Sequence, residues 1–131
     1  MRISQELLDE MVAHAVADAP NECCGIVSSK DGEATKVYRA TNTEASPFRF
    51  VIDPKQVYDI HTAIEDTGLD LGAIYHSHTR SDPYPSQTDV NFAAQWPGVQ
   101  WIIVGTANGD PQVRNYEIRD GEISDAELEV G

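Results

Sequence analysis

Apolar side chains recur three or four positions apart in three parts of the chain, residues 4–19, 53–67 and 86–96. This spacing places them along one side of a helix, so each part is predicted to be a helix that packs that side on a core. Each part begins with a side chain that favours a helix N-terminus and is followed by proline or glycine. The capping residues are Ser4, Asp53 and Ser86.

Short runs rich in β-branched and aromatic residues predict strands between and after these helices. The predicted strands are residues 23–29, 35–41, 48–52, 71–78 and 99–106, followed by a hairpin over 113–130 that turns at Asp120–Gly121. Strands that alternate with helices indicate an α/β fold with a largely consecutive sheet. At 131 residues the chain fits one domain, residues 1–131.

The composition is strongly acidic. Nine Lys and Arg residues stand against 22 Asp and Glu residues, which gives a formal net charge of -13. A surface of this sign repels phosphate groups, so nucleic acid is not an expected partner. Two interpretations of the charge stay open, solubility and a docking face for a basic protein.

The first predicted helix carries acidic residues among its apolar positions, which is typical of neither a signal peptide nor a membrane anchor. Cys23 and Cys24 are adjacent on a predicted strand and should point to opposite faces of the sheet, which disfavours a disulfide between them. Cys24 is expected to be inert packing rather than a nucleophile. We therefore expect a cytoplasmic protein with no membrane partner.

Two histidines stand at the carboxyl end of the predicted strand 71–78. Residues i and i+2 of a strand share a face, so His76 and His78 can direct both imidazoles at one metal ion while Ser77 points away. The pair alone is weak evidence, because two partly exposed strand histidines have the same spacing. A catalytic zinc site also needs a third protein ligand and an open position for water.

Three further polar residues can complete such a site. Asp89 can supply the third ligand, and Ser86 can donate a hydrogen bond to the oxyanion of a tetrahedral intermediate. Both also have a structural interpretation, because they have the spacing of a helix capping box. Glu22, just before the strand 23–29, can act as the base if apolar surroundings raise its pKa. By composition alone it is one acid among many.

These residues stand in the order of a known motif. A glutamate, then His-Ser-His, seven residues, a serine, two residues and an aspartate resemble the motif of the JAMM (MPN+) zinc metallopeptidases, and every motif position matches. Glu22 lies in "PNECCGIV", and the histidines lie in "GAIYHSHTRSDPYPSQTD". The resemblance extends from the first helix to the last hairpin. Thr79 departs from it, because many members have proline after the second histidine, and this leaves the loop shape open.

The resemblance implies a JAMM/MPN fold, which is cytidine-deaminase-like, with a mixed β-sheet flanked by helices. It implies that His76, His78 and Asp89 bind one Zn2+ together with a water molecule. It also implies that Glu22 is the general base and acid and that Ser86 stabilises the oxyanion.

The nearest resemblance is to bacterial hydrolases of the CysO-cysteine hydrolase type, which release an amino acid from the C-terminus of a ubiquitin-like sulfur-carrier protein. It implies that the substrate is a carrier with a Gly-Gly tail, cut at a C-terminal peptide or isopeptide bond, with cysteine as the candidate product. A homodimer stays open.

Two other functions fit parts of the pattern. A metal-free MPN-type interaction scaffold has the same fold, but the retention of every motif position argues against it. A zinc deaminase also places a glutamate beside a metal-activated water. The chain lacks the Pro-Cys-x-x-Cys pair expected of that class, since its only cysteines are Cys23 and Cys24.

Overall fold

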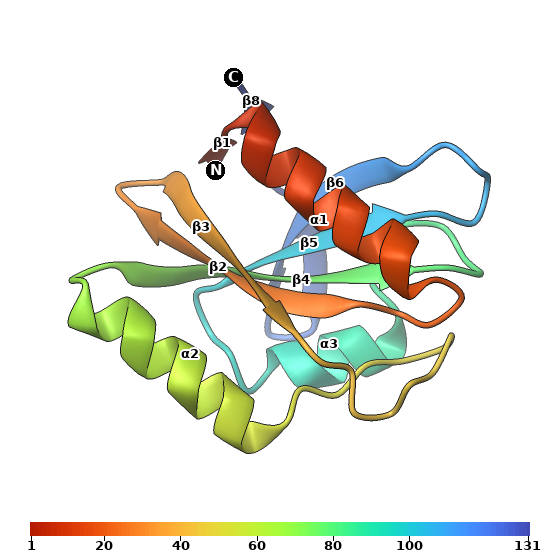
Figure 1. Cartoon of the computed structure of the whole chain (residues 1–131), viewed down its shortest axis with the longest axis horizontal. Coiled ribbons are helices and arrows are strands. Elements are labelled where there is room, and N and C mark those ends of the chain that lie inside the picture. The colour runs from red at the N-terminus through yellow and green to blue at the C-terminus, as the bar shows by residue number, and fades with distance from the viewer.

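The computed structural model describes all 131 residues and contains three helices and one eight-stranded sheet (Figure 1). The sheet is mixed, which confirms the expected α/β class. The helices are α1 (Gln5–Asp18), α2 (Pro54–Asp66) and α3 (Gln87–Ala93). The strands are β1 (Arg2–Ile3), β2 (Cys24–Lys30), β3 (Glu33–Ala40), β4 (Asp70–His78), β5 (Gln100–Gly105), β6 (Gln112–Arg119), β7 (Glu122–Asp125) and β8 (Glu129–Val130).

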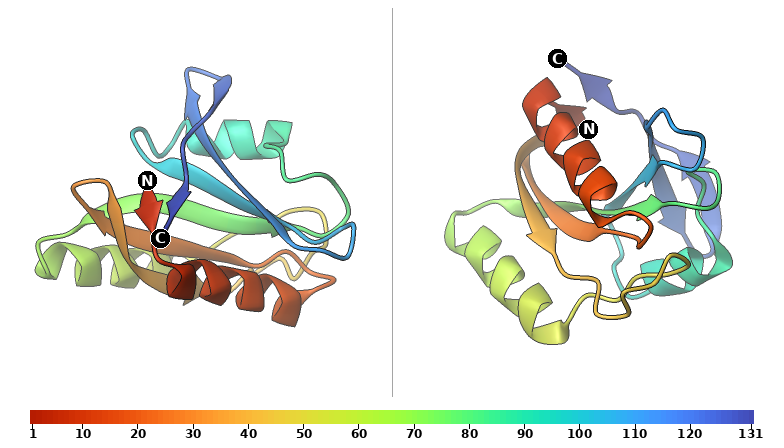
Figure 2. Two further views of the ribbon diagram at one scale, coloured as in Figure 1. Left: turned by 90° about the horizontal axis from the view of Figure 1, so that it is seen from above. Right: turned by 45° about the vertical axis from the view of Figure 1, so that its right-hand side comes forward.

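The strand order is β7-β6-β5-β4-β2-β3-β1-β8. β7 and β8 stand at opposite ends of this order although only a few residues separate them in sequence, so the sheet must curl until its ends approach. The last strand pairs in parallel with β1, where Arg2 is opposite Glu129, and the two chain termini lie side by side (Figure 2). The amino group of Met1 adds a hydrogen bond to the carbonyl of Glu127 at 2.8 Å.

The three helices confirm the predictions from hydrophobic spacing and capping. The Ser4 hydroxyl accepts the Leu7 N–H, and the Asp53 carboxylate accepts the Lys55 N–H. The third helix is shorter than predicted and ends at Ala93. Asp89 and Ala93 of this helix are buried, and the partly buried Val90 and Phe92 also pack on the core.

The predicted strand over residues 48–52 is wrong. This segment is irregular and has a single isolated bridge, between Asn42 and Ile52. The side chain of Asn42 binds the Arg49 carbonyl and the Val51 N–H, which are groups that a sheet would otherwise pair. Phe48 is left 72% exposed. β propensity was therefore overridden by a side chain that binds the backbone.

The predicted hairpin over residues 113–130 is correct at its turn and too long at its end. Asp120 and Gly121 have φ values of 52° and 80°, as a two-residue hairpin turn requires, and they join β6 to β7. The Ala126 N–H still donates to the Asn115 carbonyl of β6, and the chain then crosses to β1. Curling of the sheet brings that second edge within reach, and no local sequence pattern encodes this.

Two hydrophobic clusters fill the two faces of the sheet. One includes Met11 and Ala15 of α1, and the other includes Ile60 and Ile64 of α2. Successive residues of β4 alternate between them, with Tyr75 on the α1 side and Ile74 on the α2 side. No helix in the structure has the length and hydrophobicity that crossing a bilayer requires.

Candidate metal centre and catalytic site

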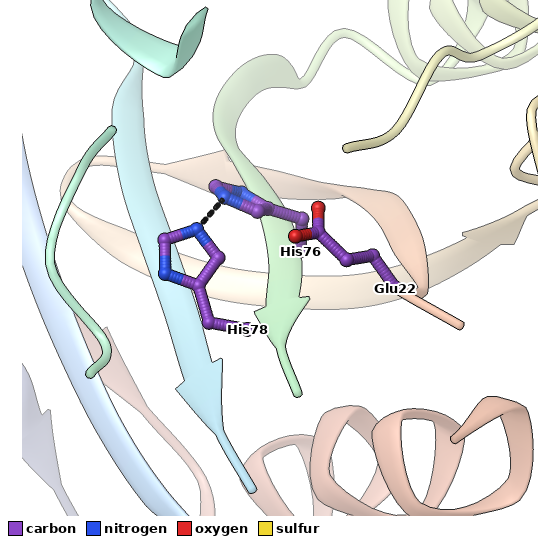
Figure 3. Close-up of side chains that lie close together, drawn as sticks. All are labelled: Glu22, His76 and His78. Atoms are coloured by element: carbon purple, nitrogen blue, oxygen red, sulfur yellow. Dashed lines mark hydrogen bonds between the residues drawn. The ribbon is translucent and has the colours of Figure 1, made fainter. Parts of the chain in front are cut away.

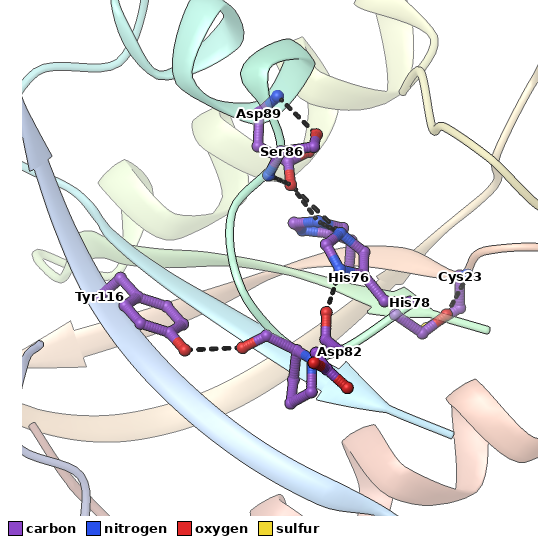
Figure 4. Close-up of polar contacts among 9 residues, drawn as sticks. Cys23, His76, His78, Asp82, Ser86, Asp89 and Tyr116 are labelled. Carbon is purple, nitrogen blue, oxygen red and sulfur yellow. Dashed lines mark hydrogen bonds and ion pairs between the residues drawn. The ribbon is translucent and has the colours of Figure 1, made fainter. Parts of the chain in front are cut away.

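The alternation of β4 directs both histidines to the α2 side of the sheet. His76 and His78 are buried, and their Nε2 atoms face each other at 3.1 Å (Figure 3). Asp89, near the start of α3, directs Oδ2 to the same point, 3.1 Å from Nε2 of His76 and 3.2 Å from Nε2 of His78 (Figure 4). The structure therefore brings these three sequence-predicted residues together.

The triangle formed by these three atoms suits a metal ion. A tetrahedral zinc site with bonds of about 2.0 Å separates its ligand atoms by about 3.3 Å, close to the observed 3.1–3.2 Å. Two imidazole nitrogens and one carboxylate oxygen are donors that zinc accepts, and three of them leave one position open. The residues present thus fit the ion that the motif implies.

Neighbouring groups fix the orientation of both rings. The Asp82 carbonyl oxygen lies 2.9 Å from Nδ1 of His78, which favours a proton on Nδ1 and leaves Nε2 free to ligate. Nδ1 of His76 is buried without a hydrogen-bond partner. The ring of His76 is held instead by stacking on Phe50, with centroids 4.5 Å apart and an interplanar angle of 28°.

Asp89 combines a structural role with its position at the site. Its backbone N–H donates to the Ser86 hydroxyl at 3.2 Å, and its Oδ2 accepts the Ser86 backbone N–H at 2.9 Å, so the predicted capping box is present. Burial alone would raise the pKa of Asp89. Its interactions with His76, His78 and the Ser86 N–H more than offset this and hold the pKa well below its usual range. The carboxylate is therefore ionised.

Glu22 stands slightly back from this triangle. It precedes β2, is 4% exposed, and has a carboxylate oxygen within 4.8 Å of a ring nitrogen of each histidine (Figure 3). Burial raises its pKa to about 7, against the attraction of His78. A group with this pKa can both accept and donate a proton at neutral pH.

The two histidines can form a ligand set with either of two carboxylates, Glu22 or Asp89. Glu22, His76 and His78 lie within 4.8 Å of one another, whereas Asp89 approaches both histidines to 3.1–3.2 Å. We take Asp89 as the better third ligand because it is closer and ionised. The longer separation and raised pKa of Glu22 suit proton transfer instead.

The pKa values of the two histidines shift in opposite directions. Complete burial lowers the pKa of His76 and favours the neutral ring that can bind a metal. Burial acts in the same direction on His78, but its hydrogen bonds to Asp89 and to the Asp82 carbonyl outweigh it and raise the pKa. As the pH falls, His78 therefore takes up a proton more readily than an ordinary histidine. A metal ion must displace that proton to bind the ring, so metal affinity should fall with the pH.

Neither cysteine is available for chemistry at neutral pH. Both are buried and free, and they belong to the clusters on opposite faces of the sheet. Burial raises the pKa of Cys23 and the pKa of Cys24 to about 12 each. Their thiols stay protonated and act as core side chains.

Several contacts at the site have no signal in the sequence. Phe50 was predicted only as part of a strand, and the Asp82 carbonyl belongs to an irregular loop. Thr79, which replaces the expected proline, donates its hydroxyl to the Pro20 carbonyl at 2.7 Å. This bond ties the loop after β4 to the chain just before Glu22.

A groove lies beside this site at the protein surface. It has a volume of about 260 Å³ and lies between the irregular segment 49–51 and the exposed side of α3. Its lining includes Phe50, which stacks on His76, and Asp89, whereas Glu22 and the two histidines do not line it.

Comparison with known proteins identifies the family. Residues 4–119 match the family of prokaryotic homologs of the JAB domain. The chain is 35% identical over 133 residues to a CysO-cysteine peptidase of Mycobacterium tuberculosis, covering 98% of this chain and 89% of the relative. It is 34% identical over 111 residues to a desampylase of Haloferax volcanii, covering 79% and 78% of the two chains.

Solved structures give the same fold. The solution structure of protein DSY2949 from Desulfitobacterium hafniense superposes with a TM-score of 0.88 and 25% identity, covering 99% of this chain and 92% of that chain. The family match spans the whole segment from Glu22 to Asp89. The chain therefore belongs to the prokaryotic branch of the JAB-domain family, the JAMM/MPN family that its motif resembles.

Proposed function

We propose that this chain is a zinc-dependent peptidase that hydrolyses the C-terminal peptide or isopeptide bond of a ubiquitin-like sulfur-carrier protein. His76, His78 and Asp89 hold one zinc ion. Glu22 transfers protons, and Ser86 donates a hydrogen bond to the oxyanion. The observation that carries the proposal is the triangle of three ligand atoms, 3.1–3.2 Å apart, beside a buried carboxyl group whose pKa is about 7.

Zinc held in this position supplies a Lewis acid that activates water and polarises the amide carbonyl. Glu22 accepts the proton of the attacking water and then returns it to the leaving amine. Its raised pKa suits both steps, because at neutral pH the carboxylate can accept a proton and the carboxylic acid can donate it. The buried site keeps other water away from the reacting bond.

Ser86 suits the role of oxyanion donor. Its hydroxyl oxygen accepts the Asp89 N–H in the capping box, which fixes the oxygen and leaves the hydroxyl proton free to donate. A fixed donor stabilises charge that develops in the transition state more than charge in the ground state. The cap and the catalytic role are therefore compatible.

The substrate class rests on the relatives and on the groove. One relative is named for peptidase action on CysO-cysteine. We infer that an extended glycine tail lies along the groove beside Asp89 while the globular body of the carrier protein stays outside. We infer that the carrier supplies the acyl side of the bond and that cysteine is the first candidate for the released group.

The proposal is tested by incubating zinc-loaded protein with ubiquitin-like carriers from its own genome, each extended by one amino acid. Intact-mass measurement should show the loss of one residue from one carrier, and omission of zinc should prevent it. A carrier joined through its terminal carboxyl to a lysine side chain tests the isopeptide bond in parallel. If no carrier loses mass with zinc bound at full occupancy, the proposed function is wrong.

A further inference from the structure

Hydrogen bonds hold the backbone on both sides of the Glu22 side chain. The Glu22 N–H donates to the Ser46 carbonyl at 2.8 Å. Its carbonyl accepts from Nδ2 of Asn42 at 3.0 Å. The following N–H, that of Cys23, donates to the Ser77 hydroxyl at 2.8 Å. These three bonds fix the backbone on both sides of the Glu22 side chain.

Ser77 provides this contact from the opposite face of the sheet. It lies between the two histidines, so strand alternation turns its side chain away from them and toward Cys23. The residue is fully buried, and its own N–H donates to the Cys23 carbonyl at 3.2 Å. The same three residues of β4 therefore carry both histidines and the anchor of the chain that bears Glu22.

Asn42 provides the second anchor with every hydrogen bond that its side chain can make. Its Nδ2 donates to the carbonyls of Glu22 and Arg49, both at 3.0 Å. Its Oδ1 accepts the N–H groups of Glu44 and Val51, both at 3.1 Å. A buried amide with two donors and two acceptor positions filled by backbone groups is rigid.

These bonds also connect Glu22 to His76. Arg49 and Val51, which Asn42 binds, flank Phe50, and Phe50 stacks on the imidazole of His76. One buried side chain thus fixes the backbone of the carboxylate and the backbone of the ring that orients a histidine. A shift of Asn42 would change the separation between these two groups.

We propose that Asn42 and Ser77 are positioning residues that hold the Glu22 backbone from two sides and so set the distance between its carboxylate and the histidine pair. The consequence for catalysis rests on the proposed function. The consequence for the backbone does not, and it can be measured without any substrate.

Two substitutions break these contacts with little change in shape. Ser77→Ala removes the acceptor of the Cys23 N–H. Asn42→Asp keeps an acceptor for Glu44 and Val51 but places an oxygen, in place of the donor, against the Glu22 carbonyl. In Ser77→Ala, zinc affinity measured by chelator competition should stay within about threefold, because no ligand atom is removed and the Phe50 segment keeps its contacts.

The chain offers a matched control for each substitution. Ser28→Ala removes a buried hydroxyl at the other end of β2, 2.7 Å from the Thr35 hydroxyl. Asn115→Asp alters a buried amide on β6 that donates to the Glu127 carbonyl at 3.3 Å. Both controls lose similar bonds away from Glu22, so they report the effect of the chemistry alone.

Amide hydrogen exchange of the metal-free protein gives the first readout. In Ser77→Ala the Cys23 amide should exchange about tenfold faster or more. In Asn42→Asp the Glu22 amide should do the same, because loss of the bond to the Arg49 carbonyl loosens the segment that carries the Ser46 carbonyl. The controls should leave both amides unchanged. Wild-type exchange rates at Cys23 and Glu22 in the two variants would overturn the proposal.

Kinetics on a cleavable carrier give the second readout. We expect kcat to fall about tenfold or more in both variants while KM stays within about twofold, because misplacement of a proton-transfer group affects the transition state and not substrate binding. Loss of stability without a fall in kcat at unchanged KM would show that Asn42 and Ser77 are ordinary core residues.

If the wild-type protein cleaves no carrier, the proposed function fails by itself. Crystal structures of the variants then test the positioning role. A Glu22 carboxylate in its wild-type place would then overturn the positioning role.

Discussion

Oδ2 of Asp89 lies 3.1 Å from Nε2 of His76, although the two residues are 13 positions apart in sequence and belong to a helix and a strand. The same oxygen accepts the Ser86 backbone N–H and closes the capping box of α3. One atom therefore joins the N-terminus of α3 to the histidine pair. Metal binding at this point should also stabilise the first turn of α3.

Glu22→Gln separates metal binding from proton transfer. The three closest ligand atoms remain, so we expect normal zinc content, whereas kcat should fall about 100-fold or more because the amide exchanges no proton. Metal analysis and steady-state cleavage of a carrier measure the two effects. Glu6→Gln, on the exposed side of α1, is the charge-matched control. A normal rate in Glu22→Gln would refute its role as the base.

Ser86→Ala separates helix capping from oxyanion stabilisation. We expect a loss of about 1 kcal/mol in unfolding free energy from the lost cap and a fall in kcat of about 100-fold from the lost donor. Ser4→Ala is the matched control. The Ser4 hydroxyl accepts the Leu7 N–H at 3.2 Å, the same distance at which the Ser86 hydroxyl accepts the Asp89 N–H. Both variants should lose similar stability. Equal activity of the two variants would leave Ser86 as a cap alone.

His78→Ala removes one corner of the ligand triangle. We expect zinc affinity to fall by at least about 100-fold, since only two protein ligands remain. Chelator competition measures this affinity. His61→Ala changes a partly exposed histidine on α2 and should leave it unchanged. Full zinc binding by His78→Ala would show that the ligand set is wrong.

The raised pKa of Glu22 predicts a pH dependence of stability in the metal-free protein. Its pKa is about 7 in the folded state against an ordinary value of 4.5. The folded state therefore holds the proton more tightly, and this contribution is complete below pH 4.5 and is lost as the pH rises through 7. Stability that depends on Glu22 should thus decrease between pH 5 and pH 8.

Urea unfolding of wild-type protein and Glu22→Gln with chelator at both pH values measures this contribution. The glutamine stays neutral, so the variant should gain stability relative to wild type by about 1–2 kcal/mol at pH 8, after allowance for screening by solvent. A difference that does not change with pH would contradict the raised pKa.

Much of the fold follows from local patterns. Hydrophobic spacing and capping residues gave three helices, and the turn at Asp120–Gly121 was found from its sequence. The error at residues 48–52 arose because Asn42, several positions away, takes the backbone groups that a strand would pair. The error at the C-terminus arose because β8 pairs with β1, and proximity of the two edges depends on the curl of the whole sheet.

The sequence by itself determined that His76 and His78 share one face, because strand alternation is a property of the backbone, and that Ser86 and Asp89 form a capping box, because helix geometry joins residues three apart. Only the tertiary structure decided that Glu22 reaches the same point. β2 pairs with β4 so that Cys24 is opposite His76, and this antiparallel register brings Glu22 level with His78. Hydrophobic packing of the two strands fixes that register across more than fifty residues, and no local pattern contains it.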